Sequence, residues 1–171
     1  GVSAHGSMPS AGINAIYSAA RAISSLEGFE FGIDAHPILG PPTLNVGTIA
    51  GGSNINSVPD RTTFTIDIRT VPPQSGQRIL SDLKKCLGHD VELTVLTDQR
   101  AVASDPQDPW IQEIFTLMGT HIGERPIPRG VTYFTDASAL AAAFDNPPII
   151  ILGPGQPEMA HKTDEHCRIS H

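Results

Sequence analysis

The most reactive side chains of the sequence gather near its end, in the stretch AHKTDEHC. His161 and Asp164 lie three residues apart there, directly after a glycine-rich loop. An imidazole beside carboxylates is a ligand combination that suits zinc. Cys167 beside a histidine could instead suggest a thiol nucleophile, although neither a base nor an orienting group is indicated. A solvated polar loop explains the same spacing, so the residues alone leave all three interpretations open.

Three polar residues in the first half are further candidates. His5 lies in SAHGSMP just before a helical pattern, and Asn56 lies in the polar segment GGSNINSVPDR. Both segments also read as ordinary turns or hairpin connections. Arg69 ends an alternating strand and shares a face with Asp67. If something covers that face, Arg69 is placed to pair with a carboxylate, and if water covers it, Arg69 is a surface charge.

Alternating and helical patterns of apolar residues predict the elements that position these side chains. Up to about Arg100 the order is α-β-β-α-β, and one more strand ahead of Gly1 would make β-α-β-β-α-β, a unit with two helices on one face of an antiparallel sheet. The predicted elements are a helix over 13–28, strands over 43–50 and 62–69, a helix over 79–87 and a strand over 91–95.

The pattern of predicted secondary structure changes from Ala101 onward. A polar DPQDP linker precedes a helix carrying Trp110 to Met118, and YFTDASAL predicts a helix capped by Thr135 or Asp136. The run Ile149–Leu152 predicts a strand buried on both faces, as in a parallel sheet. Antiparallel and α/β textures in one chain indicate two domains, with a boundary near 98–108.

The loop after that run contains two glycines, Gly153 and Gly155. They could form a simple turn, or they could bring backbone N–H groups against a ligand.

The composition and charge of the chain argue against some classes of function. The chain has 171 residues, 11 basic and 18 acidic side chains and a formal charge of −7, with 5% aromatic residues. This balance argues against a nucleic-acid or anionic-membrane partner. Nothing approaches the roughly 18 apolar residues of a membrane span, and no secretory signal opens the chain. Cys86 and Cys167 predict free thiols in a reducing cytoplasm. Because no Met precedes Gly1, we expect a fragment of a longer protein.

Four segments in order resemble one enzyme family. The resemblance is to the co-catalytic zinc amidohydrolases and exopeptidases, which include acetylornithine deacetylase, succinyl-diaminopimelate desuccinylase, aminoacylase and carboxypeptidase relatives. It implies that residues 1–100 are an α+β lid, or dimerisation, domain of ferredoxin-like topology whose first strand is largely missing. Residues 101–171 would be the C-terminal portion of the α/β zinc-hydrolase domain. The segments are SAHGSMPSAGINAI, LNVGTIAGGSNINSVPDRTTFTIDIR, YFTDASAL and LGPGQPEMAHKTDEHC.

The same resemblance assigns roles to single residues. His161 matches a zinc ligand, and His5 matches a lid histidine that reaches a neighbouring subunit's active site and steadies the oxyanion. Asn56 and Arg69 match positions that hold the carboxylate end of the substrate. The full enzyme would hold two zinc ions, with cobalt or manganese as alternatives. The substrate pocket would be lined by Thr135, Asp136, Ser138, Gly153 and Gly155.

The function implied is hydrolysis of amide bonds in N-acyl amino acids or small peptides, of the deacetylase or desuccinylase kind, by a cytoplasmic homodimer joined through its lids. Alternatives are a dipeptidase or carboxypeptidase of the same family, a dimerisation module without catalysis, and a small-molecule-sensing domain that leaves the GPG…AHKTDE segment unexplained. The family's HxDxV segment and paired glutamates do not occur in this chain. We therefore expect the chain alone to lack activity and stoichiometric zinc, and to expose apolar surface around Ile149–Leu152.

Overall fold

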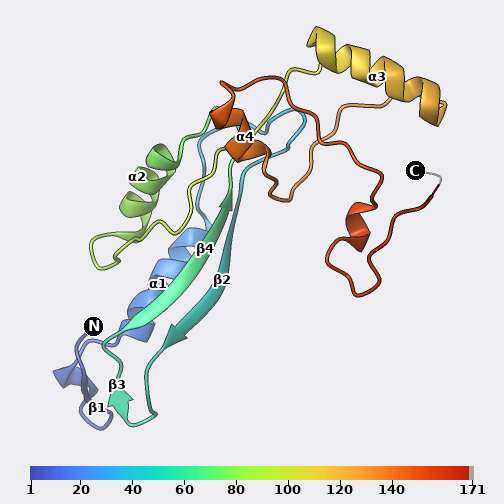
Figure 1. Cartoon of the computed structure of the whole chain (residues 1–171). Helices are drawn as coiled ribbons and strands as arrows, with labels where there is room; N and C mark the ends of the chain where they lie inside the picture. The colour runs from blue at the N-terminus through green and yellow to red at the C-terminus, as the bar shows by residue number, and fades with distance from the viewer. Residues whose placement is uncertain (170–171) are drawn as a thin grey trace.

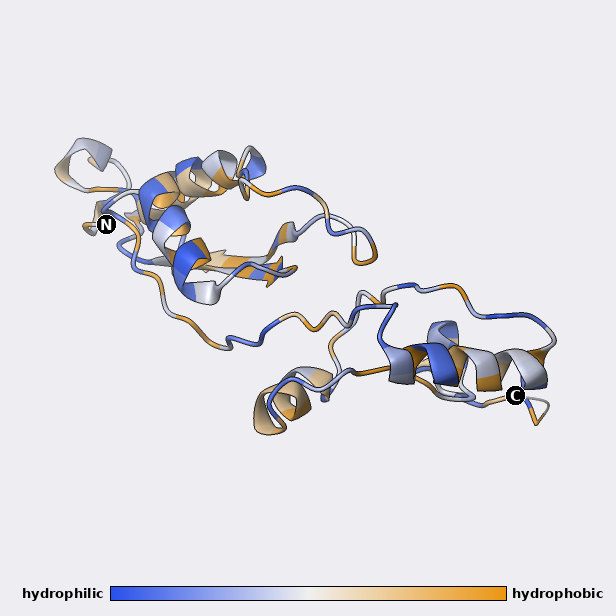
Figure 2. Ribbon diagram, turned by 90° about the horizontal axis from the view of Figure 1, so that it is seen from above, coloured by the Kyte–Doolittle hydropathy of each residue, from blue (hydrophilic) through white to orange (hydrophobic). Residues whose placement is uncertain are grey.

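The structure, a computed structural model, describes residues 1–169. Its first part packs two helices against a long two-stranded ribbon, and its second part carries two more helices joined by extended loops (Figures 1 and 2). The elements are β1 Ala4–His5, η1 Pro9–Ala11, α1 Ala15–Glu27, β2 Thr43–Gly51, β3 Ser57–Val58, β4 Thr62–Arg69, α2 Gly76–Leu87, α3 Pro109–Ile122, α4 Ala137–Ala143 and η2 Pro157–Met159.

The ribbon consists of β2 and β4, which pair antiparallel from Thr43 opposite Arg69 to Gly51 opposite Thr62. Side chains alternate along β4 because successive Cβ atoms point to opposite faces. The residues at even positions, such as Ile66, are partly buried, whereas Asp67 and Arg69 are exposed. The strands predicted over 43–50 and 62–69 are thus confirmed.

Both predicted helices of the first part form, α1 inside the predicted range 13–28 and α2 from Gly76, three residues before the predicted start at Ile79. Asn14 caps α1, since its Oδ1 accepts hydrogen bonds from the N–H groups of Ile16 and Tyr17 at 2.9 and 3.2 Å. The hydroxyl of Ser75 caps α2 in the same way. The helices end at Gly28 and Gly88.

The core lies between these helices and one face of the ribbon. Apolar side chains are removed from water in this core, and that burial is the main favourable term in folding. The core cluster consists of Ala22, Leu26, Ile79, Leu83 and Leu87, with partly buried Phe29, Leu44, Val46, Phe64, Ile66, Ile68, Cys86, Val91 and Leu93 packed against it.

The strand predicted over 91–95 is wrong. Val91 and Leu93 pack against the core, but their backbone joins no ladder, so their alternation reflects contact with the core and not strand pairing. At the start of the chain, β1 pairs with β3 and not with the ribbon. Because the ribbon has two strands within residues 1–169, the β-α-β-β-α-β order is not confirmed.

In the second part, α3 confirms the predicted helix, with Asp108 as its cap. The first turn of α4 is held by Thr135, whose hydroxyl accepts a hydrogen bond from the Ala137 N–H at 3.2 Å. Asp136 makes no such bond with its side chain. Of the two capping residues that the sequence left open, Asp136 occupies the N-cap position, and Thr135 supplies the side-chain hydrogen bond to the first turn.

The strand predicted over Ile149–Leu152 is also wrong. The run is extended, but a buried strand needs neighbouring strands, and no strand within residues 1–169 pairs with it. The Ser104 hydroxyl holds its start, accepting from the N–H of Ile149 at 2.8 Å and donating to its carbonyl at 3.0 Å. Ile151 and Leu152 are 49% and 63% exposed, which confirms the predicted apolar surface.

No helix found in residues 1–169 combines the length and the apolar character needed to cross a membrane.

Candidate functional site

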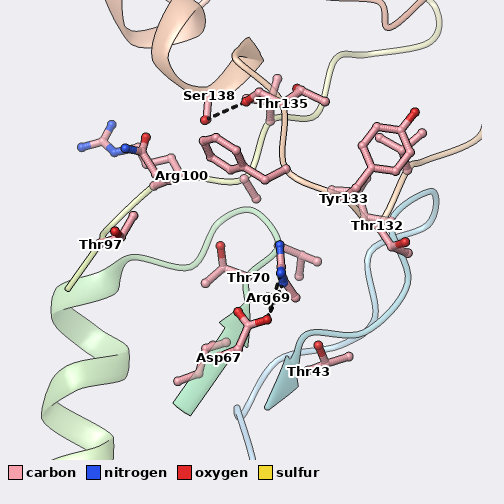
Figure 3. Close-up of a pocket in the computed structure, with 18 of the residues that line it drawn as sticks. Thr43, Asp67, Arg69, Thr70, Thr97, Arg100, Thr132, Tyr133, Thr135 and Ser138 are labelled. Carbon is pink, nitrogen blue, oxygen red and sulfur yellow. Dashed lines mark hydrogen bonds and ion pairs between the residues drawn. The ribbon is translucent and has the colours of Figure 1, made fainter. Parts of the chain in front are cut away.

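A large cleft separates the two parts of the molecule and brings several predicted site residues to a common space. Its volume is about 3070 Å³, several times the roughly 300–1,000 Å³ of an ordinary ligand pocket. Figure 3 shows the end of β4 on one side and the start of α4 on the other. The cleft is therefore wider than one small substrate, and a second surface is needed to enclose a ligand in it.

Arg69 lies at the end of β4 on the wall of this cleft. Its Nε and Nη2 groups donate to the same oxygen of Asp67, Oδ2, at 3.1 and 2.8 Å. Side chains of this pair are 52% and 54% exposed, so the solvated alternative from the sequence describes the present surroundings. Since one edge of the guanidinium faces Asp67, the edge formed by Nη1 and Nη2 stays free for a second carboxylate.

Thr135 and Ser138 face this space from the start of α4 (Figure 3). The Ser138 hydroxyl donates to the carbonyl of Thr135 at 3.3 Å, so both side chains are tied to the first turn of the helix. Asp136, between them, is exposed and does not line the cleft. The structure thus brings two of these three predicted pocket residues together with Arg69.

Gly153 and Gly155 also line the cleft. A Cβ atom built on either residue would meet no atom within 4 Å, and neither has a positive φ. Neither glycine is therefore required by a tight turn or a close contact within residues 1–169.

His161 follows the short helix η2 and has a positive φ of 62°. Its backbone N–H donates to Oε2 of Glu165 at 3.0 Å. Over the described range 1–169, no group of three His, Cys, Asp or Glu side chains is placed to hold a metal ion. Zinc sites use three or four protein ligands, so these residues alone do not form one. Cys167 is exposed, and its thiol makes no hydrogen bond to a described histidine.

His5 and Asn56 form a second group, at the tip where β1 pairs with β3. The Gly6 N–H donates to the carbonyl of Asn56 at 2.7 Å, which joins the two loops. A Cβ at Gly6 would lie 2.9 Å from that carbonyl, closer than side chains tolerate, so only glycine allows this approach. The side chain of Asn54 supports the loop by accepting from the Asn56 N–H at 3.2 Å.

The two groups lie at opposite ends of the ribbon. The seven residue steps from Thr62 to Arg69 span roughly 23 Å at the usual rise of a strand, with the tip beyond Thr62 and the cleft beyond Arg69 (Figure 1). One chain therefore does not bring His5 and Asn56 to the same small ligand as Arg69 and Thr135.

Among the cleft residues that sequence reasoning did not single out are Arg100 and Tyr133 (Figure 3). Both lie in segments without helix or strand, where no periodic pattern could have indicated which way they face.

Comparison with known proteins shows which proteins this chain resembles. Residues 1–93 match the family described as the M20 peptidase dimerisation domain. A probable succinyl-diaminopimelate desuccinylase of Staphylococcus epidermidis is 31% identical over 123 residues, which are 69% of this chain and 30% of that protein. An acetylornithine deacetylase of Myxococcus xanthus is 25% identical over 182 residues, 99% of this chain and 46% of that protein. The chain thus spans less than half the length of either relative.

Solved structures share the fold. An M20 family metallo-carboxypeptidase, Sso-CP2 of Sulfolobus solfataricus, aligns with a TM-score of 0.64 at 19% identity, over 81% of this chain and 50% of that one. A tripeptidase of Staphylococcus aureus aligns with a TM-score of 0.61 at 23% identity, over 83% and 38%. Because the dimerisation-domain match covers 93 of the 171 residues, the chain belongs to the M20 peptidase family.

Proposed function

We propose that this chain is part of a zinc-dependent hydrolase of amide bonds in N-acyl amino acids or small peptides. Residues 1–100 serve as the lid and dimerisation domain, and residues 101–171 serve as the C-terminal portion of the catalytic domain. The match of residues 1–93 to the dimerisation-domain family carries the proposal. The relatives named desuccinylase and deacetylase support an N-acyl amino acid as substrate, and the peptidase structures support a small peptide as the second candidate.

The separation of the two polar groups supports a site shared between two copies. In one chain the tip with His5 and Asn56 lies beyond Thr62, which is itself roughly 23 Å along the ribbon from Arg69. A symmetric dimer presents the same surface twice, so the tip of one copy can enter the cleft of the other and narrow it to the size of a substrate. His5 would then donate to the carbonyl oxygen that gains charge during hydrolysis, while Arg69 grips the substrate carboxylate.

We also propose a metal site, some of whose ligands lie outside the described residues. His161 would supply one imidazole ligand, and two zinc ions, with cobalt or manganese as substitutes, would activate water and polarise the amide carbonyl. Because residues 1–169 contain no second and third ligand beside His161, those ligands would come from another segment.

A dimerisation module without catalysis is the alternative function, and complementation separates the two. The complete gene product carrying His5→Ala is mixed with the same protein carrying Arg69→Ala, and subunits are exchanged. With substrate well below KM, each parent should be nearly inactive towards a panel of N-acetyl and N-succinyl amino acids and dipeptides. Random pairing should restore about a quarter of wild-type turnover, because half the dimers then hold one intact shared site.

The activity panel decides the rest of the proposal. No recovery from two inactive parents would contradict the shared site, and no turnover by the wild-type gene product, with zinc supplied, would favour the module. Turnover restricted to unblocked dipeptides would identify a peptidase in place of a deacylase.

Arg69→Lys tests the carboxylate grip. Lysine keeps the charge but loses the planar fork that binds a carboxylate through two donors. We expect KM of the complete enzyme to rise about tenfold or more, with a smaller change in kcat, because the carboxylate lies at the end of the substrate that does not react. Steady-state kinetics with Arg21→Lys, an exposed change on α1, supplies the matched control. Equal KM values for both variants would refute the grip.

A further inference from the structure

Ser7 lies beside His5, in a turn that no role proposed above uses. The turn is closed by the Met8 N–H, which donates to the His5 carbonyl at 2.8 Å. Inside it, the backbone N–H of Ser7 lies 3.2 Å from Nδ1 of His5 and its hydroxyl oxygen lies 2.7 Å from the same atom. Two groups of one residue therefore meet a single ring nitrogen.

The chemistry of these groups fixes the direction of the hydrogen bonds. A backbone N–H can only donate, so Nδ1 must be the acceptor. The Ser7 hydroxyl, which can rotate, then donates to Nδ1 as well. A neutral imidazole carries one proton, and with Nδ1 accepting, that proton sits on Nε2. In this arrangement Nε2 is a hydrogen-bond donor, and it makes no hydrogen bond to any residue from 1 to 169.

Neighbouring backbone holds the main chain of His5 in place. His5 pairs with Ser57 in the short ladder, and the Gly6 N–H is bonded to Asn56. The imidazole is exposed, Ser7 is its hydrogen-bond partner within the described chain, and Nε2 is open to a second molecule. A donor fixed before the substrate arrives costs no reorganisation during reaction.

We propose that Ser7 is a positioning residue for His5, which keeps the proton on Nε2 and presents that N–H outward as a donor. The inference rests on the proposed function for its catalytic consequence, but the tautomer itself can be measured without catalysis.

Two other histidines provide internal controls for the tautomer. Nδ1 of His36 accepts from the N–H groups of Ile38 and Leu39 at 3.2 and 3.1 Å, so His36 should carry its proton on Nε2 like His5. Nδ1 of His166 lies 2.7 Å from the carbonyl of Asp164, which can only accept, so His166 should carry its proton on Nδ1. The described chain should thus contain both tautomers.

The first measurement is long-range 1H–15N correlation NMR of the 171-residue chain with 15N-labelled histidine, above the range in which imidazoles titrate. Wild-type His5 and His36 should show a protonated Nε2, and His166 a protonated Nδ1. In Ser7→Ala the hydroxyl donor is lost and the backbone donor stays, so the Nδ1-protonated share of His5 should rise about threefold or more. Ser7→Thr should restore the wild-type pattern, and Ser10→Ala, on the same tip without a bond to His5, should leave it unchanged.

The second measurement is turnover of the complete gene product. Ser7→Ala should lower kcat about three- to tenfold with KM unchanged, and Ser7→Thr should recover most of the loss. An unchanged His5 tautomer and unchanged kcat in Ser7→Ala would overturn the inference, and if His5→Ala is still strongly impaired, the proposed function survives. If His5→Ala itself keeps full activity, the oxyanion role of His5 fails, while the NMR result still decides whether Ser7 fixes the tautomer.

Discussion

His5→Ala in the complete gene product should lower kcat by roughly a hundredfold or more, the usual effect of removing one donor to a developing oxyanion. Bound zinc, measured by atomic absorption, should not change, because His5 lies at the tip of the ribbon and His161 follows η2 in the other part of the molecule. The effect should fall on kcat more than on KM, since the donor is needed most when the carbonyl oxygen carries charge.

His89→Ala is the matched control for this experiment. It removes another exposed imidazole of residues 1–100, one without a hydrogen bond to any described residue, and should leave kcat within twofold of wild type. If His5→Ala behaves like His89→Ala, His5 has no part in catalysis and the shared site has to be redrawn.

Leu26→Ala should have the largest effect on stability. Leu26 is 3% exposed and lies in the cluster that joins α1 and α2 to the ribbon. Removing a buried leucine side chain costs about 2–5 kcal/mol, depending on how far the neighbours collapse into the cavity. This is a large share of the total stability of an ordinary domain, about 5–15 kcal/mol, and the core here is small. We therefore expect partial unfolding at room temperature.

Urea unfolding of the 171-residue chain, followed by circular dichroism, measures this loss. Tyr17→Ala on the same helix is the control, because Tyr17 is 66% exposed and surface changes usually stay within about 0.5 kcal/mol. Equal midpoints for the two variants would show that the cluster does not hold the helices to the ribbon.

The sequence predicted best those elements whose partners lie nearby in the chain. α1, β2, β4 and α2 carry clear apolar periods, the two helices have explicit caps, and each element packs against another of the four. The predictions failed for 91–95 and Ile149–Leu152, although the apolar patterns of these segments are as clear as those of the four elements. A strand is defined by its hydrogen-bonded neighbour and not by its own residues, and neither segment has such a neighbour among residues 1–169.

The candidate site follows the same division. Spacing alone did not distinguish Arg69 from a surface charge, and the structure shows it paired with Asp67 on the wall of a cleft. Only geometry could show that His5 and Arg69 lie at opposite ends of one ribbon, because sequence distance carries no direction in space. The role of Ser7 was equally hidden, since a serine two residues from a histidine becomes informative only when a turn folds it back onto the ring.

The length of the ribbon sets the distance between the tip and the cleft, and this distance can be engineered. Deleting two facing residues from each of β2 and β4 would draw the tip about 7 Å closer to the cleft while keeping Phe64, Ile66 and Ile68 on the core side. Deleting one residue from each would reverse the faces of all residues between the deletion and the tip. The length of the ribbon can therefore change only in steps of two residues. A partner cleft could then be matched to ribbons of different length by changing only the depth of the cleft.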